Sequence, residues 1–532
     1  MVRRVSSSIF VGRVPERAEL IAGLEAAGRG EPGLVVLGGE AGIGKSRLAA
    51  ELWATANARG ARVVSGRCLE TRAVTLPFAP WIEILRDVLL ADRERVVAVS
   101  PEPGLAELAR LVPELRSSLG PDAQSPSGDD PGQLFHAVLD LLRRVAKGRP
   151  PLLILVEDLH WADASSLDLL RFIAAQLTGE PLLIVATFRN DELRESQGLQ
   201  AALGELVRLP HVLRLDLRPF DQREVADQLT GISGRPSAPD VVNQIFARSD
   251  GNPFVVEELA GQPSGSPLPP TLRDVMAARM STLSPETRRV VAAAAAIGRD
   301  VGGDILATVA GMPEHRVQQA LNEATDQHVL VRAASSGTAD YAFRHALIQE
   351  FAYGELSPAE RRALHGEISK ALIDAGGSSG EVARHARLAG HLSVALASAV
   401  AAADEATAAL AFAEALTYVQ QALKMWDEVA DPEATGHTDR PALLALGARC
   451  AVAIGDWGQA VALRRSALSL LDPARRAERI ALLLDLADSL QFSADWPGVT
   501  ETIRQAAALI PTSPPTAQRA RVVAELANSA MD

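Results

Sequence analysis

Residues Gly39 to Ser46 read G-E-A-G-I-G-K-S and directly follow the apolar run at 34–37. This spacing is the P-loop pattern G-x-x-x-x-G-K-[ST] in the setting it requires, between a buried strand and a helix. Glycines at 39, 42 and 44 let phosphate oxygens approach backbone N–H groups, and the helix that starts near Lys45 directs its N-terminal dipole at the anion. The sequence therefore predicts a nucleoside triphosphate site.

The residue types inside this motif each suit a phosphate site. Lys45 would place a compact positive charge on the β- and γ-phosphates, and Ser46 would offer its hydroxyl to Mg²⁺. The alternative is a chance match in a glycine-containing turn, and the helical pattern at 46–56 argues against it. We expect the whole loop to surround the phosphates: Gly39, Glu40, Ala41, Gly42, Ile43, Gly44, Lys45, Ser46 and Arg47.

A second motif is the apolar run at 152–156 followed by Glu157 and Asp158. Two adjacent acids at the end of a strand repel each other unless a cation lies nearby. Either acid could instead cap the following helix. Together with the P-loop upstream, they predict that Glu157 holds Mg²⁺, directly or through water, and that Asp158 orients the water that attacks the γ-phosphate. Lys45, Glu157 and Asp158 are thus candidate catalytic residues, and Ser46, Glu157 and Asp158 are candidate Mg²⁺ ligands.

Short apolar segments alternate with helical patterns from residue 9 to about 260, as a parallel α/β sheet requires. A helical lid is expected from about residue 218, so that 1–260 forms one P-loop ATPase domain. The expected strands are 34–37, 61–65, 152–156, 182–187 and 212–216.

The remainder of the chain indicates helical domains. The stretch at 261–270, rich in Pro, Gly and Ser, reads as a linker. Residues 271–375 contain helical patterns followed by two short apolar segments, at 329–331 and 341–344, which predicts a winged-helix-like domain. From 380 to 532 the sequence reads as paired helices. The fold class is therefore multidomain: an α/β P-loop domain, a winged-helix-like domain and an α-helical array.

Weak repetition within this array suggests repeats of the tetratricopeptide type. The block Gly455-Asp456-Trp457 has a counterpart 39 residues later in Ala494-Asp495-Trp496. Small residues, Ala467 and Ala506, follow at equivalent positions, where a neighbouring helix can approach closely. An unrepeated bundle with coincidental Asp-Trp pairs is the alternative. The expected last helix, 517–530, has no polar cap, so the array is expected to be truncated.

Composition narrows the function classes. The net charge of −13 has the wrong sign for a nucleic-acid footprint over the whole chain, so this segment alone is not expected to bind DNA. The two cysteines, Cys68 and Cys450, lie too far apart for a metal-ligand or disulfide framework. With neither a signal peptide nor an apolar run of membrane-spanning length, we expect a cytoplasmic protein.

Three strings together resemble the STAND class of signalling ATPases. They are V-E-D-L-H-W-A-D at 156–163, F-V-G-R at 10–13 and G-N-P-F-V-V-E-E-L at 251–259. They are most similar to the large ATP-binding regulators of the LuxR family and to the related ATPase region of soluble adenylyl cyclases. The resemblance implies binding of ATP, ADP and Mg²⁺ and adds candidate nucleotide contacts: Phe10, Val11, Gly12 and Arg13 beside the adenine, Pro253 against the adenine, and His345 at the ADP phosphates.

The resemblance also implies that Arg189 is the sensor arginine that reads the γ-phosphate, which makes it a fourth candidate catalytic residue. A guanidinium suits this role because its planar fork matches phosphate oxygens. A surface arginine beside Asp191 and Glu192 is the alternative reading. Pro253 could equally be a turn proline, and His345 could be a core histidine.

The chain departs from that family at two points. Glu157 stands where many relatives carry Asp, and nothing after residue 380 resembles the helix-turn-helix that ends the LuxR-family regulators. We therefore expect a fragment or truncated relative of such a regulator.

The function expected from the sequence is a nucleotide-operated switch. An inducer, small molecule or protein, would be sensed by the helical repeats. Activation would cause self-association, weak and slow ATP hydrolysis would reset the switch, and no membrane partner is expected. The alternatives are a nucleotide-binding scaffold without turnover and a P-loop kinase.

Overall fold

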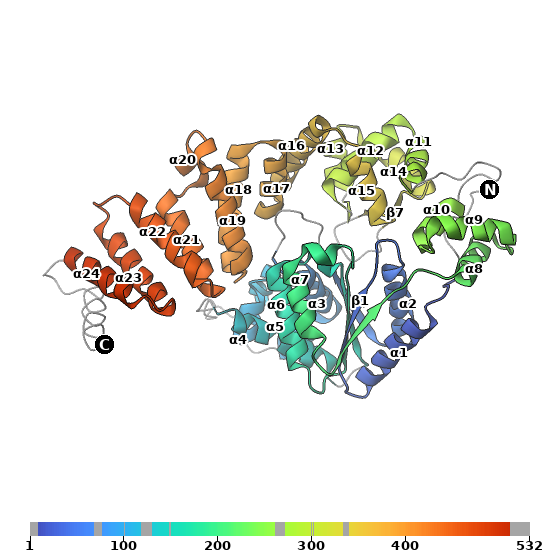
Figure 1. The fold of residues 1–532 in the computed structure, drawn as a ribbon, viewed down its shortest axis with the longest axis horizontal. Helices are drawn as coiled ribbons and strands as arrows, with labels where there is room; N and C mark the ends of the chain where they lie inside the picture. Colours follow the sequence, from blue (N-terminus) through green and yellow to red (C-terminus); the bar gives the residue numbers. More distant parts are fainter. Residues whose placement is uncertain are drawn as a thin grey trace. The chain divides into compact units, whose positions relative to one another are not determined.

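The computed structural model describes residues 9–68, 77–99, 102–118, 130–147, 150–260, 272–298, 300–301, 303–332 and 340–510 (Figure 1). The predicted linker at 261–270 and the predicted helix at 517–530 lie outside these residues. Apart from residues 128–131, one compact unit runs to Ala371 and a second begins at Leu372.

A five-stranded parallel sheet forms the centre of the first unit, with strand order β2-β3-β4-β1-β5. Its strands lie where the apolar segments predict them, which confirms the α/β assignment. All five are parallel, and β1, β3 and β4 are almost entirely buried because helices cover both faces. The bounds are β1 Gly33–Gly38, β2 Arg62–Arg67, β3 Leu152–Glu157, β4 Leu182–Thr187 and β5 Val212–Asp216.

The sheet positions the site because the carboxyl ends of its middle strands share one edge. Leu37 on β1 lies beside Thr187 on β4, and Val156 on β3 lies beside Ala186. The P-loop, Glu157 and Thr187 therefore emerge close together, as expected for open α/β sheets, whose ligands bind outside the carboxyl ends of the strands.

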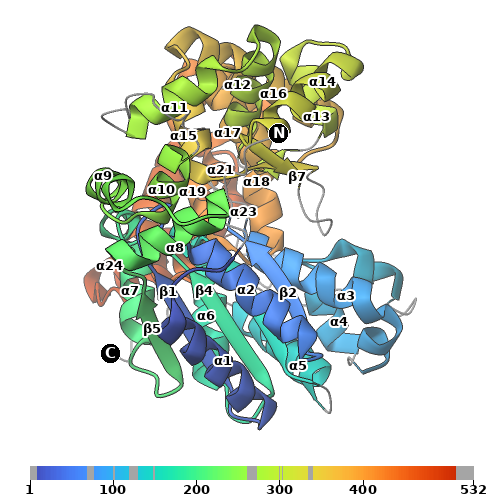
Figure 2. The ribbon, with the colours of Figure 1, turned by 90° about the vertical axis from the view of Figure 1, so that its right-hand side faces the viewer.

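Helices α1 and α2 cover one face of the sheet, and α5, α6 and α7 cover the other (Figures 1 and 2). Buried leucines of α1 and α2, such as Leu20 and Leu48, meet the strand residues Leu153 and Leu183 in one core. No helix within the described ranges is long and apolar enough to cross a bilayer. The bounds are α1 Val14–Gly28, α2 Lys45–Ala58, α3 Ala79–Val99, α4 Glu102–Leu108, η1 Pro113–Ser118, α5 Pro131–Ala146, η2 Leu159–Trp161, α6 Ala164–Gln176, η3 Glu192–Glu195 and α7 Gln197–Leu206.

Three short helices follow β5, in the region where a lid is expected, and are called the lid below: α8 Gln222–Ser233, α9 Pro239–Ser249 and α10 Pro253–Ala260. Their core includes Val11 from the N-terminal segment. Gly251 is needed at the turn before α10: its φ is +73°, and a Cβ there would lie 2.1 Å from Phe220 O. That turn fixes where the lid meets the start of the chain.

The winged-helix segment follows within the same unit. A three-stranded antiparallel sheet of order β6-β8-β7 accompanies its helices. The paired strands β7 and β8 lie at the two short apolar segments expected in this region, whereas β6 has only two residues, too few to produce a sequence pattern. The elements are α11 Leu272–Ser281, α12 Pro285–Ile297, β6 Asp300–Val301, α13 Gly303–Ala310, α14 Glu314–Asp326, β7 Leu330–Arg332, β8 Tyr341–Phe343, α15 Ala346–Gly354 and α16 Pro358–Asp374.

The second unit is built from helices that pack in sequence-adjacent pairs. Asp456 and Asp495 cap the N-termini of α22 and α24, which explains why the Asp-Trp blocks recur. Ala467 and Ala506 are fully buried, as their spacing predicts. The helices are α17 Ser379–Ala389, α18 Leu392–Ala408, α19 Phe412–Met425, η4 Trp426–Glu428, α20 Pro432–Gly436, α21 Arg440–Ala453, α22 Trp457–Leu470, α23 Arg476–Phe492 and α24 Trp496–Leu509.

Candidate nucleotide-binding site

The P-loop has the backbone that a phosphate cradle needs. Gly42 and Gly44 have φ values of +76° and +102°, which side chains with a Cβ rarely adopt. A Cβ on Gly42 would also lie 2.9 Å from Phe254 Cβ. Helix α2 begins without a side-chain cap, whereas Asp163 and Asp221 cap α6 and α8. An anion at the start of α2 would therefore meet the N–H groups of a helix terminus that its N-cap residue, Gly44, leaves uncapped.

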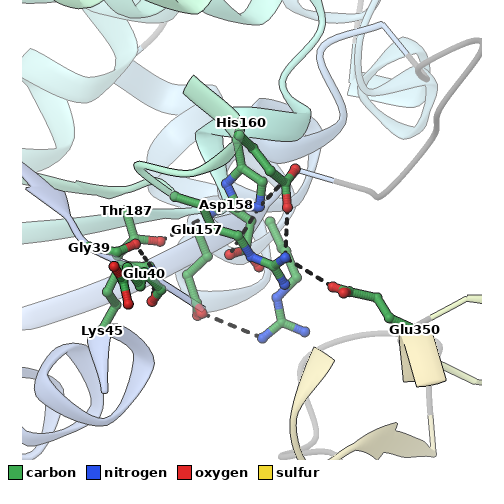
Figure 3. Close-up of polar contacts among 11 residues, drawn as sticks. Gly39, Glu40, Lys45, Glu157, Asp158, His160, Thr187 and Glu350 are labelled. Carbon is green, nitrogen blue, oxygen red and sulfur yellow. Dashed lines mark hydrogen bonds and ion pairs between the residues drawn. The ribbon is translucent and has the colours of Figure 1, made fainter. Parts of the chain in front are cut away.

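Lys45 is folded against this loop. Its Nζ donates hydrogen bonds to Gly39 O at 2.7 Å and Glu40 O at 2.9 Å (Figure 3). Burial lowers the pKa of Lys45 to about 8, and the nearby Asp158 carboxylate opposes part of that shift. The ammonium thus lies in a site poor in solvent, where a phosphate would stabilise its charged form.

A cavity of about 320 Å³ opens above the loop, a volume in the range of small-molecule sites. Five structural regions contribute to its wall: the N-terminal segment, the P-loop with α2, the ends of strands β3 and β4, the lid, and the winged-helix segment. The predicted residues that line it are Phe10, Val11, Arg13, Ala41, Gly42, Ile43, Gly44, Lys45, Ser46, Arg47, Asp158, Arg189, Pro253 and His345. Gly12, Gly39, Glu40 and Glu157 are predicted residues that do not.

The two adjacent acids have different surroundings. Glu157 ends β3 and pairs with Arg67 on the edge strand β2, with Oε2 3.6 Å from Nη2. Asp158 is buried with a φ of +62°; its backbone N–H donates to Thr187 Oγ1 at 3.0 Å, and the residue lines the cavity. The geometry therefore favours Asp158 over Glu157 as the carboxylate that meets a nucleotide.

The donor set on the cavity wall fits Mg²⁺. The Ser46 hydroxyl and the Asp158 carboxylate both line the cavity, and Mg²⁺ prefers oxygen ligands in company with phosphate oxygens. These two residues would hold the ion if nucleotide brings it, and the ion would neutralise phosphate charge.

Arg189 is buried rather than exposed on the surface. Its Nη1 lies 2.6 Å from Glu192 Oε1 and 2.9 Å from Glu350 Oε1 on α15, and its guanidinium covers the Trp161 ring. Burial alone would lower the pKa of Arg189, but Glu350 and Glu192 raise it above its ordinary value. The guanidinium is therefore fully charged on the cavity wall and bound to carboxylates of two segments.

Two buried ion pairs join the lid to the winged-helix segment. Arg344 Nη2 lies 2.8 Å from Glu257 Oε2, and Arg279 Nη1 lies 2.7 Å from Glu258 Oε1. Arg47, just after the P-loop, lies 3.5 Å from the other oxygen of Glu257. Glu257 therefore connects the start of α2 with the winged-helix segment across the wall of the cavity.

His345 also reaches the cavity from the winged-helix segment. It precedes α15, and its ring packs against that of Phe254, with centroids 4.2 Å apart. It is thus placed at the site rather than in a separate core.

Arg13 fastens the N-terminal segment to the site. Its Nη2 donates to Ile43 O in the P-loop at 2.9 Å, its Nη1 donates to Arg218 O at 2.5 Å, and the guanidinium lies over the Phe220 ring. Because Arg13 already satisfies carbonyls on both sides, it acts here mainly as a clamp that holds Phe10 and Val11 on the wall.

Sequence reasoning missed seven lining residues. Three of these residues lie in or next to recognised motifs: Phe254 and Glu257 are inside the string at 251–259, and Arg344 directly precedes His345. The others carry no local signal. The missed residues are Ile9, Phe220, Gln228, Phe254, Glu257, Arg344 and Leu347.

Comparison with known families identifies the class of this domain. Residues 9–185 match the family described as AAA ATPase domain, and this match implies nucleotide binding. The matched residues include the P-loop, Glu157, Asp158, the strands β1, β2 and β3 and the first part of β4. The first unit therefore contains an AAA ATPase domain.

Comparison with whole proteins is less specific. An uncharacterized protein of Rhizobium meliloti is 27% identical over 453 residues, which cover 79% of this chain and 43% of the relative. The chain thus spans less than half the length of that relative.

Solved structures show only distant likeness. One similar structure is the Signal Transduction ATPase with Numerous Domains (STAND) protein with a tetratricopeptide repeat sensor from Pyrococcus horikoshii. The match covers 100% of this chain and 82% of that protein's chain, at 12% identity and a TM-score of 0.43. A RuvB variant from Thermotoga maritima covers 67% of this chain and 99% of its own, at 16% identity and a TM-score of 0.27. At these low scores, the fold assignment rests on the strand order and the P-loop.

Proposed function

We propose that this chain is an ATP-operated signalling switch. One observation carries the proposal: the wall of the nucleotide cavity includes Arg344, His345 and Leu347 from the winged-helix segment as well as the P-loop. A ligand that contacts both the P-loop and the winged-helix segment has an affinity that depends on how these two segments are arranged. Nucleotide occupancy and that arrangement are then linked, which is the thermodynamic requirement for a switch.

In the proposed cycle, ADP binds with the winged-helix segment in place, and His345 lies at its phosphates. The γ-phosphate of ATP attracts Arg189, which in the described arrangement is paired with Glu350. ATP therefore favours an arrangement in which that pair is broken. Slow hydrolysis, with Asp158 orienting the attacking water, restores the ADP-bound arrangement.

The wider role follows from the resemblance to LuxR-family regulators. The helical repeats would sense an inducer, activation would lead to self-association, and the whole protein would regulate transcription. The helices after residue 380 supply the surfaces of a helical array, which suits either a small-molecule or a protein inducer.

Calorimetric titration with Mg·ADP and Mg·ATP, followed by hydrogen exchange of the winged-helix segment, tests the proposal. Lys45→Ala should abolish measurable binding of both nucleotides, because the variant lacks the compact positive charge that faces the phosphates. The unfolding temperature of the variant should be unchanged. Lys147→Ala, which removes the same charge from an exposed position after α5, is the matched control and should bind normally.

The exchange experiment then separates a switch from a scaffold. In the unsubstituted protein, ATP and ADP should produce different protection in α15 and β8, and Lys45→Ala should show neither pattern. Unchanged ATP affinity in Lys45→Ala would disprove the site. Binding with identical exchange in ATP, ADP and the free protein would disprove the switch.

A further inference from the structure

Gln228 contributes a polar group to the cavity that no motif accounts for. It lies on α8 in the lid, is 3% exposed, and lines the cavity. Its Nε2 donates a hydrogen bond to Pro253 O at 2.8 Å, whereas its Oε1 has no hydrogen-bond partner among the described residues. A buried acceptor without a donor costs free energy, so this oxygen is suited to a ligand that brings one.

The carbonyl of Pro253 fixes which end of the amide can serve the ligand. Rotating the amide by a half turn would bring Oε1 to Pro253 O, so that two acceptors faced each other and the 2.8 Å hydrogen bond was lost. Gln228 therefore presents an acceptor and not a donor. A ligand group that complements it must carry an N–H or O–H.

Several other polar groups of the wall already have partners or a role. Lys45 and Ser46 belong to the phosphate loop, Arg189 is paired with Glu350, and Glu257 is paired with Arg344. Gln228 carries the side-chain amide and Ser46 the side-chain hydroxyl among the described residues that line the wall, and the imidazole of His345 lies on the side of the winged-helix segment. Pro253 lies beside Gln228, and Val11 and Phe220 pack in the same core as Val225 and Leu229 of its helix α8. With Phe10 and Phe254 they form an apolar and aromatic part of the cavity wall, which suits a planar base.

We propose that Gln228 Oε1 accepts a hydrogen bond from the exocyclic amino group of adenine and makes this site select adenine over other purines. The proposal rests on the proposed nucleotide-binding function and adds to it the residue that selects the base. Guanine and hypoxanthine carry a carbonyl oxygen where adenine carries its amino group. That oxygen would face Oε1, and neither atom could donate.

Binding of Mg·ATP, Mg·ITP and the triphosphate of purine riboside, measured by calorimetry, tests the assignment. Purine riboside lacks the amino group but keeps the ring. The unsubstituted protein should bind ATP about tenfold more tightly than the purine riboside triphosphate, and ITP still more weakly. In Gln228→Met, which keeps the side-chain volume, the ratio of the first two affinities should fall to about one.

The controls distinguish the possible outcomes. Gln222→Met changes an exposed glutamine on the same helix and should keep the tenfold ratio. Purine riboside triphosphate affinity should be the same in Gln228→Met as in the unsubstituted protein, which shows that the variant is folded. If Gln228→Met still prefers ATP tenfold, the Gln228 assignment is wrong although the nucleotide site stands. If the unsubstituted protein binds no triphosphate, the proposed function itself fails.

Discussion

Replacing Glu350 with Gln tests whether Arg189 exchanges a carboxylate for a phosphate. Arg189 Nη1 lies 2.9 Å from Glu350 Oε1, and the two side chains are 7% and 30% exposed. A hydrogen bond between charged groups contributes about 1.5–3 kcal/mol. The amide of Gln keeps an acceptor, Glu192 remains paired with Arg189, and Glu350 is partly screened by solvent, so the expected loss is only about 1 kcal/mol.

That loss should appear as a change in nucleotide preference. If ATP binding requires Arg189 to leave Glu350, weakening the pair makes ATP bind roughly fivefold more tightly. ADP has no γ-phosphate for Arg189 to meet, so its affinity should change by less than about twofold. The Glu350→Gln variant should therefore raise the ratio of ATP affinity to ADP affinity by several fold.

Calorimetric titrations with Mg·ATP and Mg·ADP measure both affinities. Glu355→Gln makes the same change of charge on an exposed residue at the end of α15 and should leave the ratio unchanged. In an Arg189→Met background, Glu350→Gln should have no effect on the ratio, because the partner is already absent. Equal shifts for ATP and ADP in Glu350→Gln would refute the exchange of partners.

Two further predictions concern the phosphate end of the cavity. Asp158→Asn should slow phosphate release from ATP by about 100-fold. Glu157→Gln should slow it far less, because the side chain of Glu157 faces Arg67. The reverse ranking of the two variants in a phosphate-release assay would contradict the geometry. Because burial lowers the pKa of Lys45 to about 8, its ammonium is charged below pH 8 and progressively neutral above it, so ATP affinity should fall from pH 8 to pH 9.5. Lys45→Arg should remove this decline, since a guanidinium stays charged throughout; a flat profile in the unsubstituted protein would show that Lys45 does not titrate there.

Much of the fold was predictable from local pattern. The strands were correctly located because a buried parallel strand needs a continuous apolar run. The P-loop could be recognised from eight residues because its backbone demands glycine at fixed positions. The Asp-Trp blocks of the second unit recur because Asp456 and Asp495 each cap a helix.

The partners inside the cavity were not predictable in this way. Arg189 and Glu350 are 161 residues apart, and Arg344 and Glu257 are 87 residues apart. No local periodicity records such a pairing, since it depends on how whole segments pack. Gln228 is a further example of a residue that local pattern does not reveal. In the sequence it is one polar residue among others on a lid helix, and only the structure shows that Pro253 O orients its amide.

By itself the sequence determined that a strand, a glycine loop and a helix follow one another in the order of a P-loop, because these constraints act over a few adjacent residues. The tertiary structure decided what that loop faces. It turned Glu157 toward Arg67 and Asp158 toward the cavity, and it brought Arg344 and His345 to the wall of that cavity. Adjacent residues at a strand end diverge because their backbone angles differ, and the packing of distant segments then fixes what each side chain meets.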